Sequence, residues 1–312
     1  MSEGKNVNDM SRTIQLPDAL VSVEWLVDRL GADNLRVVDI RGSVTTEDLG
    51  GGRQRAAYAG APEAYAAGHI PGAVFVDWTR DITDPDADVK AQIAPPELFK
   101  ERMERIGVGD DTAVVVVDDT GGHLATRLWW ALHYYGHDQV AVLDGGYRRW
   151  TGLGLPLTRE APAVPSVTFT PRPRPELISS ADDVLRLLDA KDRQLLDARD
   201  EKTYSGAIQR GSRGGHIPGA INLPAQSLMR EDGTWRTGEE IRERAREAGV
   251  SLDQPVTAYC NGGVTATQLL FGLHRAGLSL DLISNYDGSW NEWGEREDLP
   301  VEDNRDLFSK ED

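Results

Sequence analysis

The sequence predicts an α/β protein of two duplicated domains, each with a mostly parallel central sheet flanked by helices. Three observations support this prediction. The chain has 312 residues, more than one average domain contains. Short apolar segments typical of buried strands alternate with longer segments of helical periodicity, which is the pattern of parallel α/β folds. The string GHIPGA occurs twice, at 68–73 and 215–220, so the second half repeats the first.

The predicted strands follow the same order in both halves. Each half begins with a buried strand that ends in an Asp-x-Arg pair, LRVVDIR (35–41) in the first half and QLLDAR (194–199) in the second. Downstream of GHIPGA, each half has a second apolar strand, AVVVVD (113–118) and PVTAYC (255–260). These strands predict the centre of each sheet.

A glycine-containing loop then leads each central strand into a predicted helix. The helices span 124–136 and 264–277, and each is closed by glycine. Each half ends in a related octet, LDGGYRRW (143–150) and YDGSWNEW (286–293). The two halves therefore share one plan throughout.

Proline content sets the domain boundaries. The stretch 156–178 holds six of the sixteen prolines, which is typical of an extended connection. We predict an N-terminal domain over 14–159, a proline-rich linker over 160–178 and a C-terminal domain over 179–305. The Gly- and Ala-rich loop 47–65 has two readings, a flexible surface insertion or a segment with a role near the functional site.

Net charge limits the partners. A formal charge of −17 and a pI near 4.8 disfavour nucleic acid and anionic membranes, and no basic patch is visible. No apolar run is long enough to span a membrane, and the first ten residues lack the apolar stretch of a secretory signal, so we expect a cytoplasmic protein. An anion site would have to be built locally from arginines and backbone N–H groups. The acidity itself fits salt adaptation or an ordinary acidic protein equally.

The single cysteine, Cys260, excludes an intrachain disulfide and any CxxC metal or redox site. It stands at the end of a predicted strand, before a glycine loop and a helix. Such a turn aims backbone N–H groups and a helix N-terminus at one point. The positive potential there lowers the pKa of a cysteine thiol below its free value of about 8.5 and so favours the thiolate. Gly262 and Gly263 permit the tight curl of this loop.

The first half provides an internal control for that cysteine. When the helices are superposed on their Ala-Thr pairs, at 125–126 and 266–267, the residue that matches Cys260 is Asp119. A carboxylate cannot act as a sulfur nucleophile. We therefore predict that the C-terminal domain is catalytic and the N-terminal domain is not.

With these motifs in hand, the chain resembles the tandem-domain rhodanese family, the thiosulfate and 3-mercaptopyruvate sulfurtransferases, over nearly its whole length. The shared features are GHIPGA twice, Asp-x-Arg twice, CxxGVTA at 260–266, and YDGSWNEW. The resemblance implies that the Cys260 thiolate takes sulfane sulfur from a small anionic donor, becomes a persulfide and passes the sulfur to a thiophilic acceptor such as cyanide. This covalent mechanism needs neither a metal nor an organic cofactor. Whether a protein donates or accepts the sulfur stays open.

The substrate-binding residues expected from the resemblance are the loop residues after the cysteine and two arginines. They are Asn261, Gly262, Gly263, Val264, Thr265, Arg210 and Arg213, with Thr265 as a possible extra hydrogen-bond donor and either arginine as the anion contact. Thr203 stands where the family often has an arginine, and Lys202 beside it could take that role.

The CNGG loop departs from both donor classes. Thiosulfate enzymes carry basic residues in CRKG, and mercaptopyruvate enzymes carry CG[ST]G, whose hydroxyl is absent here because residue 262 is glycine. We keep thiosulfate as the first candidate donor and 3-mercaptopyruvate as the second.

Other chemistry-bearing residues favour structural roles because they recur in both halves. His69 and His216 fit a turn before a strand, and the Asp197–Arg199 pair fits an ion pair that holds a strand end, as Asp39 and Arg41 do. Trp290 and Trp293 fit either an apolar wall beside the persulfide or the core. The residues 287–289 predict a turn next to the cysteine loop.

Two other functions could also use a cysteine in such a loop, a cysteine phosphatase and a persulfide carrier. A cysteine phosphatase needs the pattern C-x5-R, but residue 266 is alanine, so the phosphate-binding arginine is missing. A non-catalytic persulfide carrier or interaction module would keep Cys260 but take its sulfur from a protein.

Overall fold

A computed structural model describes residues 13–305 and shows two α/β domains of one plan. Five parallel strands form the sheet of the first domain, in the order β1 (Leu20–Val21), β7 (Val140–Leu143), β6 (Ala113–Val117), β2 (Leu35–Asp39) and β5 (Val74–Phe75). The second sheet, also parallel, has β11 (Ile221–Asn222), β9 (Gln194–Asp197), β12 (Val256–Tyr259), β13 (Ile283–Tyr286) and β8 (Ile178–Ser179). The predicted fold class is confirmed.

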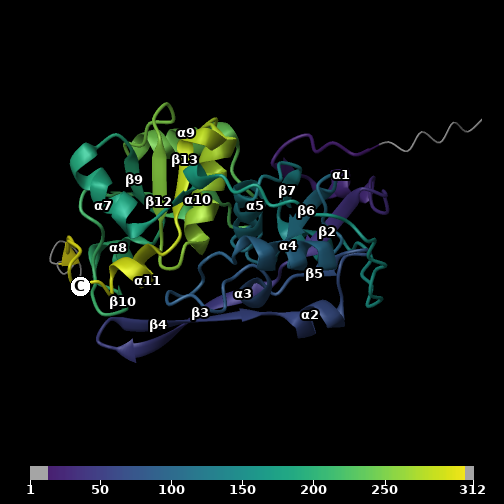
Figure 1. Cartoon of the computed structure of the whole chain (residues 1–312), viewed down its shortest axis with the longest axis horizontal. Helices are drawn as coiled ribbons and strands as arrows, with labels where there is room; N and C mark the ends of the chain where they lie inside the picture. The colour runs from purple at the N-terminus through teal and green to yellow at the C-terminus, as the bar shows by residue number, and fades with distance from the viewer. Residues whose placement is uncertain (1–12, 306–312) are drawn as a thin grey trace, which may run out of the picture.

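Helices cover the sheets in both domains (Figure 1). The first domain has α1 (Val23–Val27), α2 (Pro62–Ala67), α3 (Trp78–Asp81), α4 (Pro96–Arg105), α5 (Ala125–Tyr134) and α6 (Gly146–Gly152). The second has α7 (Ala181–Ala190), α8 (Glu201–Ser205), α9 (Gly238–Glu247), α10 (Val264–Arg275) and α11 (Ser289–Trp293). Three 3-10 helices lie at Pro175–Leu177, Ala225–Leu228 and Leu280–Leu282.

The central strands form where the sequence predicts them, because their residues are mostly apolar. Every residue of β6 is buried, as is every residue of β12, which suits a strand covered by helices on both sides. β12 lies between β9 and β13, so the residue that follows it emerges in the middle of the sheet edge.

The Asp-x-Arg and HIPG motifs hold each domain together. Arg41 pairs with Asp39 at 2.8 Å and Arg199 with Asp197 at 2.5 Å, and both pairs are buried. His69 and His216 are buried as well, and Nδ1 of each ring bonds a main-chain oxygen, of Tyr65 and Tyr204 respectively.

The two domains meet along α5 and α10, which lie side by side at the centre of the molecule (Figure 1). The contacts are reciprocal. Asp287 Oδ2 accepts the N–H of Ile93 from the other domain at 2.7 Å, and Asp144 Oδ1 accepts the N–H of Trp235 at 3.0 Å. Asp144 and Asp287, which occupy matching positions in the two halves, thus make matching bonds across the interface.

The segment 161–174 contains no helix or strand and runs along the first domain. Phe169 packs buried against Phe99, and Arg174 pairs with Asp138 at 2.7 Å. These contacts tie the extended segment to the first domain.

The glycine-rich loop forms a long hairpin of β3 (Gly42–Gly50) and β4 (Arg53–Gly60), with Gly51 and Gly52 at its turn in left-handed conformation. Figure 1 shows this hairpin reaching from beneath the first domain to the second. There β4 pairs with β10 (Gln209–Arg210) of the second domain. Of the two readings of this loop, the structure supports a role near the functional site.

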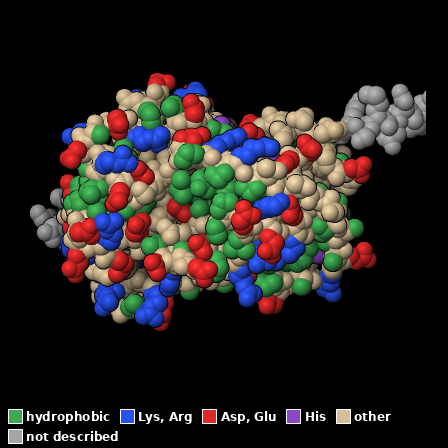
Figure 2. Space-filling model, in the orientation of Figure 1, with side chains coloured by type: hydrophobic (Ala, Val, Ile, Leu, Met, Phe, Trp, Pro, Cys, Tyr) green, Lys and Arg blue, Asp and Glu red, His purple; other side chains and the backbone are tan. Residues whose placement is uncertain are grey.

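Charged side chains of both signs are interspersed on the face drawn in Figure 2, with an apolar area near its middle. Among residues 13–305, no helix has the length and apolar character needed to cross a bilayer.

Candidate active site

Cys260 directly follows β12 and lies in the loop that enters α10. Gly263 caps the helix at φ 71°, and a Cβ there would come within 2.7 Å of the Asp287 carbonyl oxygen, so only glycine fits without a shift. Cys260 is buried, with 2% of the residue exposed. The sequence therefore folds here into a tight strand–loop–helix turn with the sulfur at its centre.

The predicted turn at 287–289 holds that loop. Ser289 Oγ accepts the N–H of Cys260 at 3.1 Å and that of Gly263 at 3.0 Å, and donates to the Tyr286 carbonyl. The Trp290 N–H donates to the Cys260 carbonyl at 3.1 Å. These bonds fix the loop from below and leave the first-turn N–H groups of α10, which have no partners within the helix, for a ligand.

The corresponding position in the first domain is Asp118, not Asp119 as the helix superposition predicts. Asp118 directly follows β6 as Cys260 follows β12, and its carbonyl accepts the N–H of Tyr147 as the Cys260 carbonyl accepts that of Trp290. The first half has one more residue between its strand and its Ala-Thr pair, which shifts an alignment made on the helix by one position.

The Asp118 carboxylate shows what such a loop binds. It accepts four backbone N–H groups at 2.8–3.2 Å, and it is 1% exposed. The donors are Thr120, Gly122, Leu124 and Ala125. A negative charge thus fills the loop cradle of the first domain, while the second domain places a sulfur at the same position.

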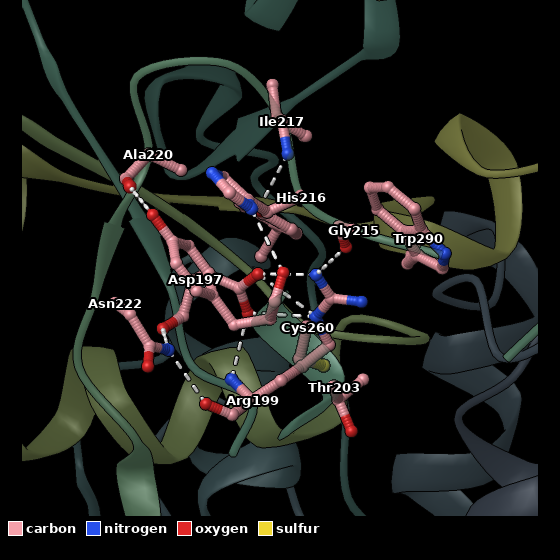
Figure 3. Close-up of polar contacts among 12 residues, drawn as sticks. Asp197, Arg199, Thr203, Gly215, His216, Ile217, Ala220, Asn222, Cys260 and Trp290 are labelled. Atoms are coloured by element: carbon pink, nitrogen blue, oxygen red, sulfur yellow. Dashed lines mark hydrogen bonds and ion pairs between the residues drawn. The ribbon is translucent and has the colours of Figure 1, made fainter. Parts of the chain in front are cut away.

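A buried cation lies beside the sulfur. Burial lowers the pKa of Arg199, but the charge of Asp197 and its hydrogen bond to the guanidinium outweigh this effect and hold the pKa above its ordinary value, with a smaller contribution from Cys260. The guanidinium lies 4.6 Å from the centroid of the Trp290 ring (Figure 3). Trp293 is fully buried and belongs to the core.

Two cavities flank the cysteine loop. One, of about 240 Å³, lies at the domain interface and includes His123, Arg199 and Thr265 in its wall. The other, of about 280 Å³, lies under the β3–β4 hairpin. Asn261 and Arg210 line both cavities, so the loop after Cys260 separates two spaces that can hold small molecules.

The predicted loop residues after Cys260 differ in whether their side chains can contact a ligand. The Asn261 side-chain oxygen is buried without a hydrogen-bond partner among the described residues, as a group that awaits a ligand would be. Thr265 Oγ1 lies 2.9 Å from His123 Nε2. The Val264 side chain belongs to the apolar core and lines neither cavity, so only its main chain can contact a ligand.

The two predicted arginines differ. Arg210 lines both cavities, and its Nε donates to Gln54 Oε1 at 3.2 Å. Arg213 lies away from both cavities, and its guanidinium donates to four main-chain carbonyls. Those carbonyls belong to Trp293, Gly294, Arg296 and Leu299.

Thr203 stands at the position where an arginine was expected from the resemblance, and its side chain bonds within its own helix. The Thr203 hydroxyl donates to Asp200 at 2.7 Å, Asp200 caps α8 by accepting the Thr203 N–H, and the Thr203 side chain is buried. Lys202 is exposed and lines neither cavity.

Two residues of the first domain at this site were not predicted from the sequence, His123 and Tyr58. His123 reaches Thr265, and Tyr58 reaches Asn291 from the hairpin. The signal for the hairpin was present: two segments of strand character flank the turn GGG (50–52), a pattern typical of a β-hairpin. His123 had no signal, because its contact depends on domain packing.

Burial lowers the pKa of His123, His133 and His137. The unfolded chain therefore takes up protons at a higher pH than the folded protein, and stability falls as the pH drops below the ordinary value of about 6.5. We expect Tm to fall between about pH 7 and pH 5 and to fall less in His137→Gln. Melting curves of the wild-type protein and of His137→Gln at each pH measure the effect. Burial also raises the pKa of Asp39 and Asp119, but both proteins contain these residues, so their contribution cancels in the comparison. Equal slopes in the two proteins would refute the histidine origin.

Comparisons with known proteins agree over both domains. The family model described as the rhodanese-like domain matches residues 22–153 and 180–296. The chain is 34% identical to the 3-mercaptopyruvate sulfurtransferase of Escherichia coli, covering 90% of this chain and 97% of the relative. It is 33% identical to the sulfur carrier protein TtuD of Thermus thermophilus, covering 91% and 96%. It is 30% identical to a putative thiosulfate sulfurtransferase of Haloferax volcanii, covering 94% and 99%.

Solved structures give the same result. The crystal structure of the 3-mercaptopyruvate enzyme SseA from Escherichia coli superposes with a TM-score of 0.76 at 30% identity, over 87% of this chain and 98% of the other. A variant of EanB in complex with ergothioneine superposes with a TM-score of 0.77 at 25% identity, over 91% of this chain and 70% of the other.

Proposed function

This chain belongs to the rhodanese-like family of sulfurtransferases, and from that premise we propose that it moves sulfane sulfur from thiosulfate to a thiophilic acceptor such as cyanide through a persulfide on Cys260. The observation that carries the proposal is the cradle around Asp118. A loop of the same plan surrounds Cys260, where the corresponding charge is that of a thiolate or a persulfide.

The proposed reaction has two displacement steps. The Cys260 thiolate attacks the outer sulfur of thiosulfate, the S–S bond of the donor breaks, and its electron pair leaves with sulfite. The acceptor then attacks the outer sulfur of the persulfide and releases the Cys260 thiolate. Backbone N–H groups at the start of α10 stabilise the sulfur anion in both states, as donors of an oxyanion hole do for oxygen.

Arg210 is the proposed anion contact. The protein carries a net charge of −17, so a dianionic donor is held only where cations gather locally. Arg210 lines both cavities beside the loop, and its fork can bind two oxygens at once.

A second candidate donor is 3-mercaptopyruvate. The CNGG loop lacks cations, and a monocarboxylate needs fewer of them than thiosulfate does. The relative of that name at 34% identity is consistent with this donor.

Persulfide formation tests the function directly. We expect the purified protein to gain the mass of one sulfur atom on incubation with thiosulfate and to lose it on addition of cyanide, with thiocyanate released. If neither donor loads Cys260 while a cysteine desulfurase does, the protein is a persulfide carrier and the proposal is wrong.

Replacement of Arg210 by alanine tests the anion contact. We expect KM for thiosulfate to rise roughly 10- to 100-fold, because a hydrogen bond to a charged group contributes about 1.5–3 kcal/mol. Arg186→Ala is the matched control, since Arg186 is exposed on α7 and pairs with Asp183. Steady-state kinetics of both variants measure the difference. An unchanged KM in Arg210→Ala would remove Arg210 from the site.

A further inference from the structure

The β3–β4 hairpin of the first domain carries a phenol to the cysteine loop. Tyr58, on β4, lines the cavity of about 280 Å³ together with Asn261 and Arg210. Asn291 Nδ2, from α11, donates to the Tyr58 hydroxyl oxygen at 3.3 Å, and the ring packs edge-on against Trp78. The hydroxyl is thereby fixed on one side by the second domain and on the other by the first.

Gly262 makes room for this hydroxyl. A Cβ at residue 262 would lie 3.2 Å from Tyr58 Oη and 2.8 Å from Asn291 Nδ2. The space that a side chain of the loop would occupy is therefore filled by Tyr58 and Asn291. Gly262 is two residues from Cys260, whose charge is among those that raise the pKa of Tyr58.

The hydroxyl hydrogen of Tyr58 is uncommitted. The oxygen accepts from Asn291, and the described residues offer no hydrogen-bond acceptor for its hydrogen. Burial is the main cause that raises the pKa of Tyr58, and the charge of Cys260 raises it further. The group therefore keeps its proton at neutral pH and can donate it to a base in the cavity.

We propose that Tyr58 is a catalytic acid, which gives its proton to the carbon leaving group when the sulfur donor is a 2-oxo thiol acid such as 3-mercaptopyruvate. This inference rests on the proposed sulfur transfer through Cys260 and assigns a proton donor for the second candidate donor of that site. The first domain, which lacks the cysteine, then supplies a reacting group to the catalytic site.

The step balances in atoms and electrons. The Cys260 thiolate attacks the sulfur of the thiol acid, an S–S bond forms, and the C–S bond breaks with its electron pair on carbon as the enolate of pyruvate. The enolate takes the Tyr58 proton and leaves as pyruvate. The phenolate then recovers a proton from the Cys260 persulfide, which keeps the donor's thiol hydrogen until that point. Thiosulfate needs no such proton, because sulfite leaves as a stable anion.

The two donors therefore respond differently to Tyr58→Phe. We expect this variant to lower kcat/KM with 3-mercaptopyruvate roughly 100-fold, within the range for loss of a general acid, and to change thiosulfate turnover by less than about threefold. The phenyl ring keeps the contact with Trp78. Tyr65→Phe is the matched control, since the Tyr65 hydroxyl donates to the Ala73 carbonyl at 2.7 Å within the first domain. Pyruvate release and thiocyanate formation give the two rates.

Each outcome decides the proposal. A loss with 3-mercaptopyruvate alone, together with a wild-type rate in Tyr65→Phe, supports it. Equal losses with both donors, no loss with either, or a wild-type protein that takes sulfur only from thiosulfate overturns it. Failure of the wild-type protein to form a persulfide with either donor would instead refute the sulfur-transfer function itself.

Discussion

Cys260→Ser is expected to lower sulfur transfer from either donor by at least ~10³-fold, because removal of a covalent nucleophile eliminates the intermediate on which both steps depend. A serine hydroxyl does not ionise near neutral pH, and its oxygen cannot carry sulfane sulfur. The N–H groups of the loop would then surround a neutral group. Thiocyanate formation and intact mass measure the loss, and we expect no mass gain on incubation with donor.

The fold should survive this change. Cys260 is buried, and serine has nearly the same volume, so the melting temperature should fall only modestly. Val264→Ala, at the first residue of α10, is a control that removes apolar contacts but keeps the thiol, and it should still form the persulfide. Turnover by Cys260→Ser near the wild-type rate would show that sulfur passes directly between donor and acceptor.

Arg127→Met is expected to cost about 3–5 kcal/mol in the free energy of unfolding, the usual consequence of breaking a buried ion pair from one side. Arg127, on α5, bonds Asp287 Oδ1 at 2.5 Å, with side chains 1% and 4% exposed. The same guanidinium donates to the carbonyls of Gly263 and Ala91. The change therefore leaves Asp287 charged and buried, and also removes a support of the cysteine loop.

Urea denaturation of both domains, followed by fluorescence and by residual activity, measures this effect. Arg174→Met is the matched control, because the Arg174–Asp138 pair is partly exposed and is expected to contribute only about 0–1 kcal/mol. We expect activity of Arg127→Met to be lost at a lower urea concentration than in the control. Coincident curves for the two variants would contradict a role of Arg127 in holding the domains.

Sequence patterns that depend on local burial predicted the fold well. The valines of β6 and the alternation of strands with helices need only neighbours within one domain, and the repeat located each counterpart. The position of Asp118 failed by one residue because loop length varies independently of the strand and helix that it joins. An alignment of the two halves made on the strand therefore differs by one residue from an alignment made on the helix. The strand pairing and the carbonyl contacts of Asp118 and Cys260 decide between the two alignments.

Contacts between domains could not be predicted. Arg210 and Arg213 are two loop arginines that look alike in sequence, yet the first lines the cavities and the second binds carbonyls of the turn after α11. Tyr58 lies far from Cys260 in the chain, and its place beside Gly262 follows from the hairpin that crosses to the second domain. Such pairs arise only once two finished domains pack together.

Asp144 and Asp287 make matching bonds across the interface between the two domains. A two-fold interface with matched contacts is how two identical subunits associate in a symmetric homodimer. Here the same kind of contact lies within one polypeptide whose two halves differ. The second half carries the thiol, while the first has a carboxylate in its cradle and a long hairpin whose β4 pairs with β10 of the second half. The chain thus joins two unlike domains as a heterodimer joins two unlike subunits.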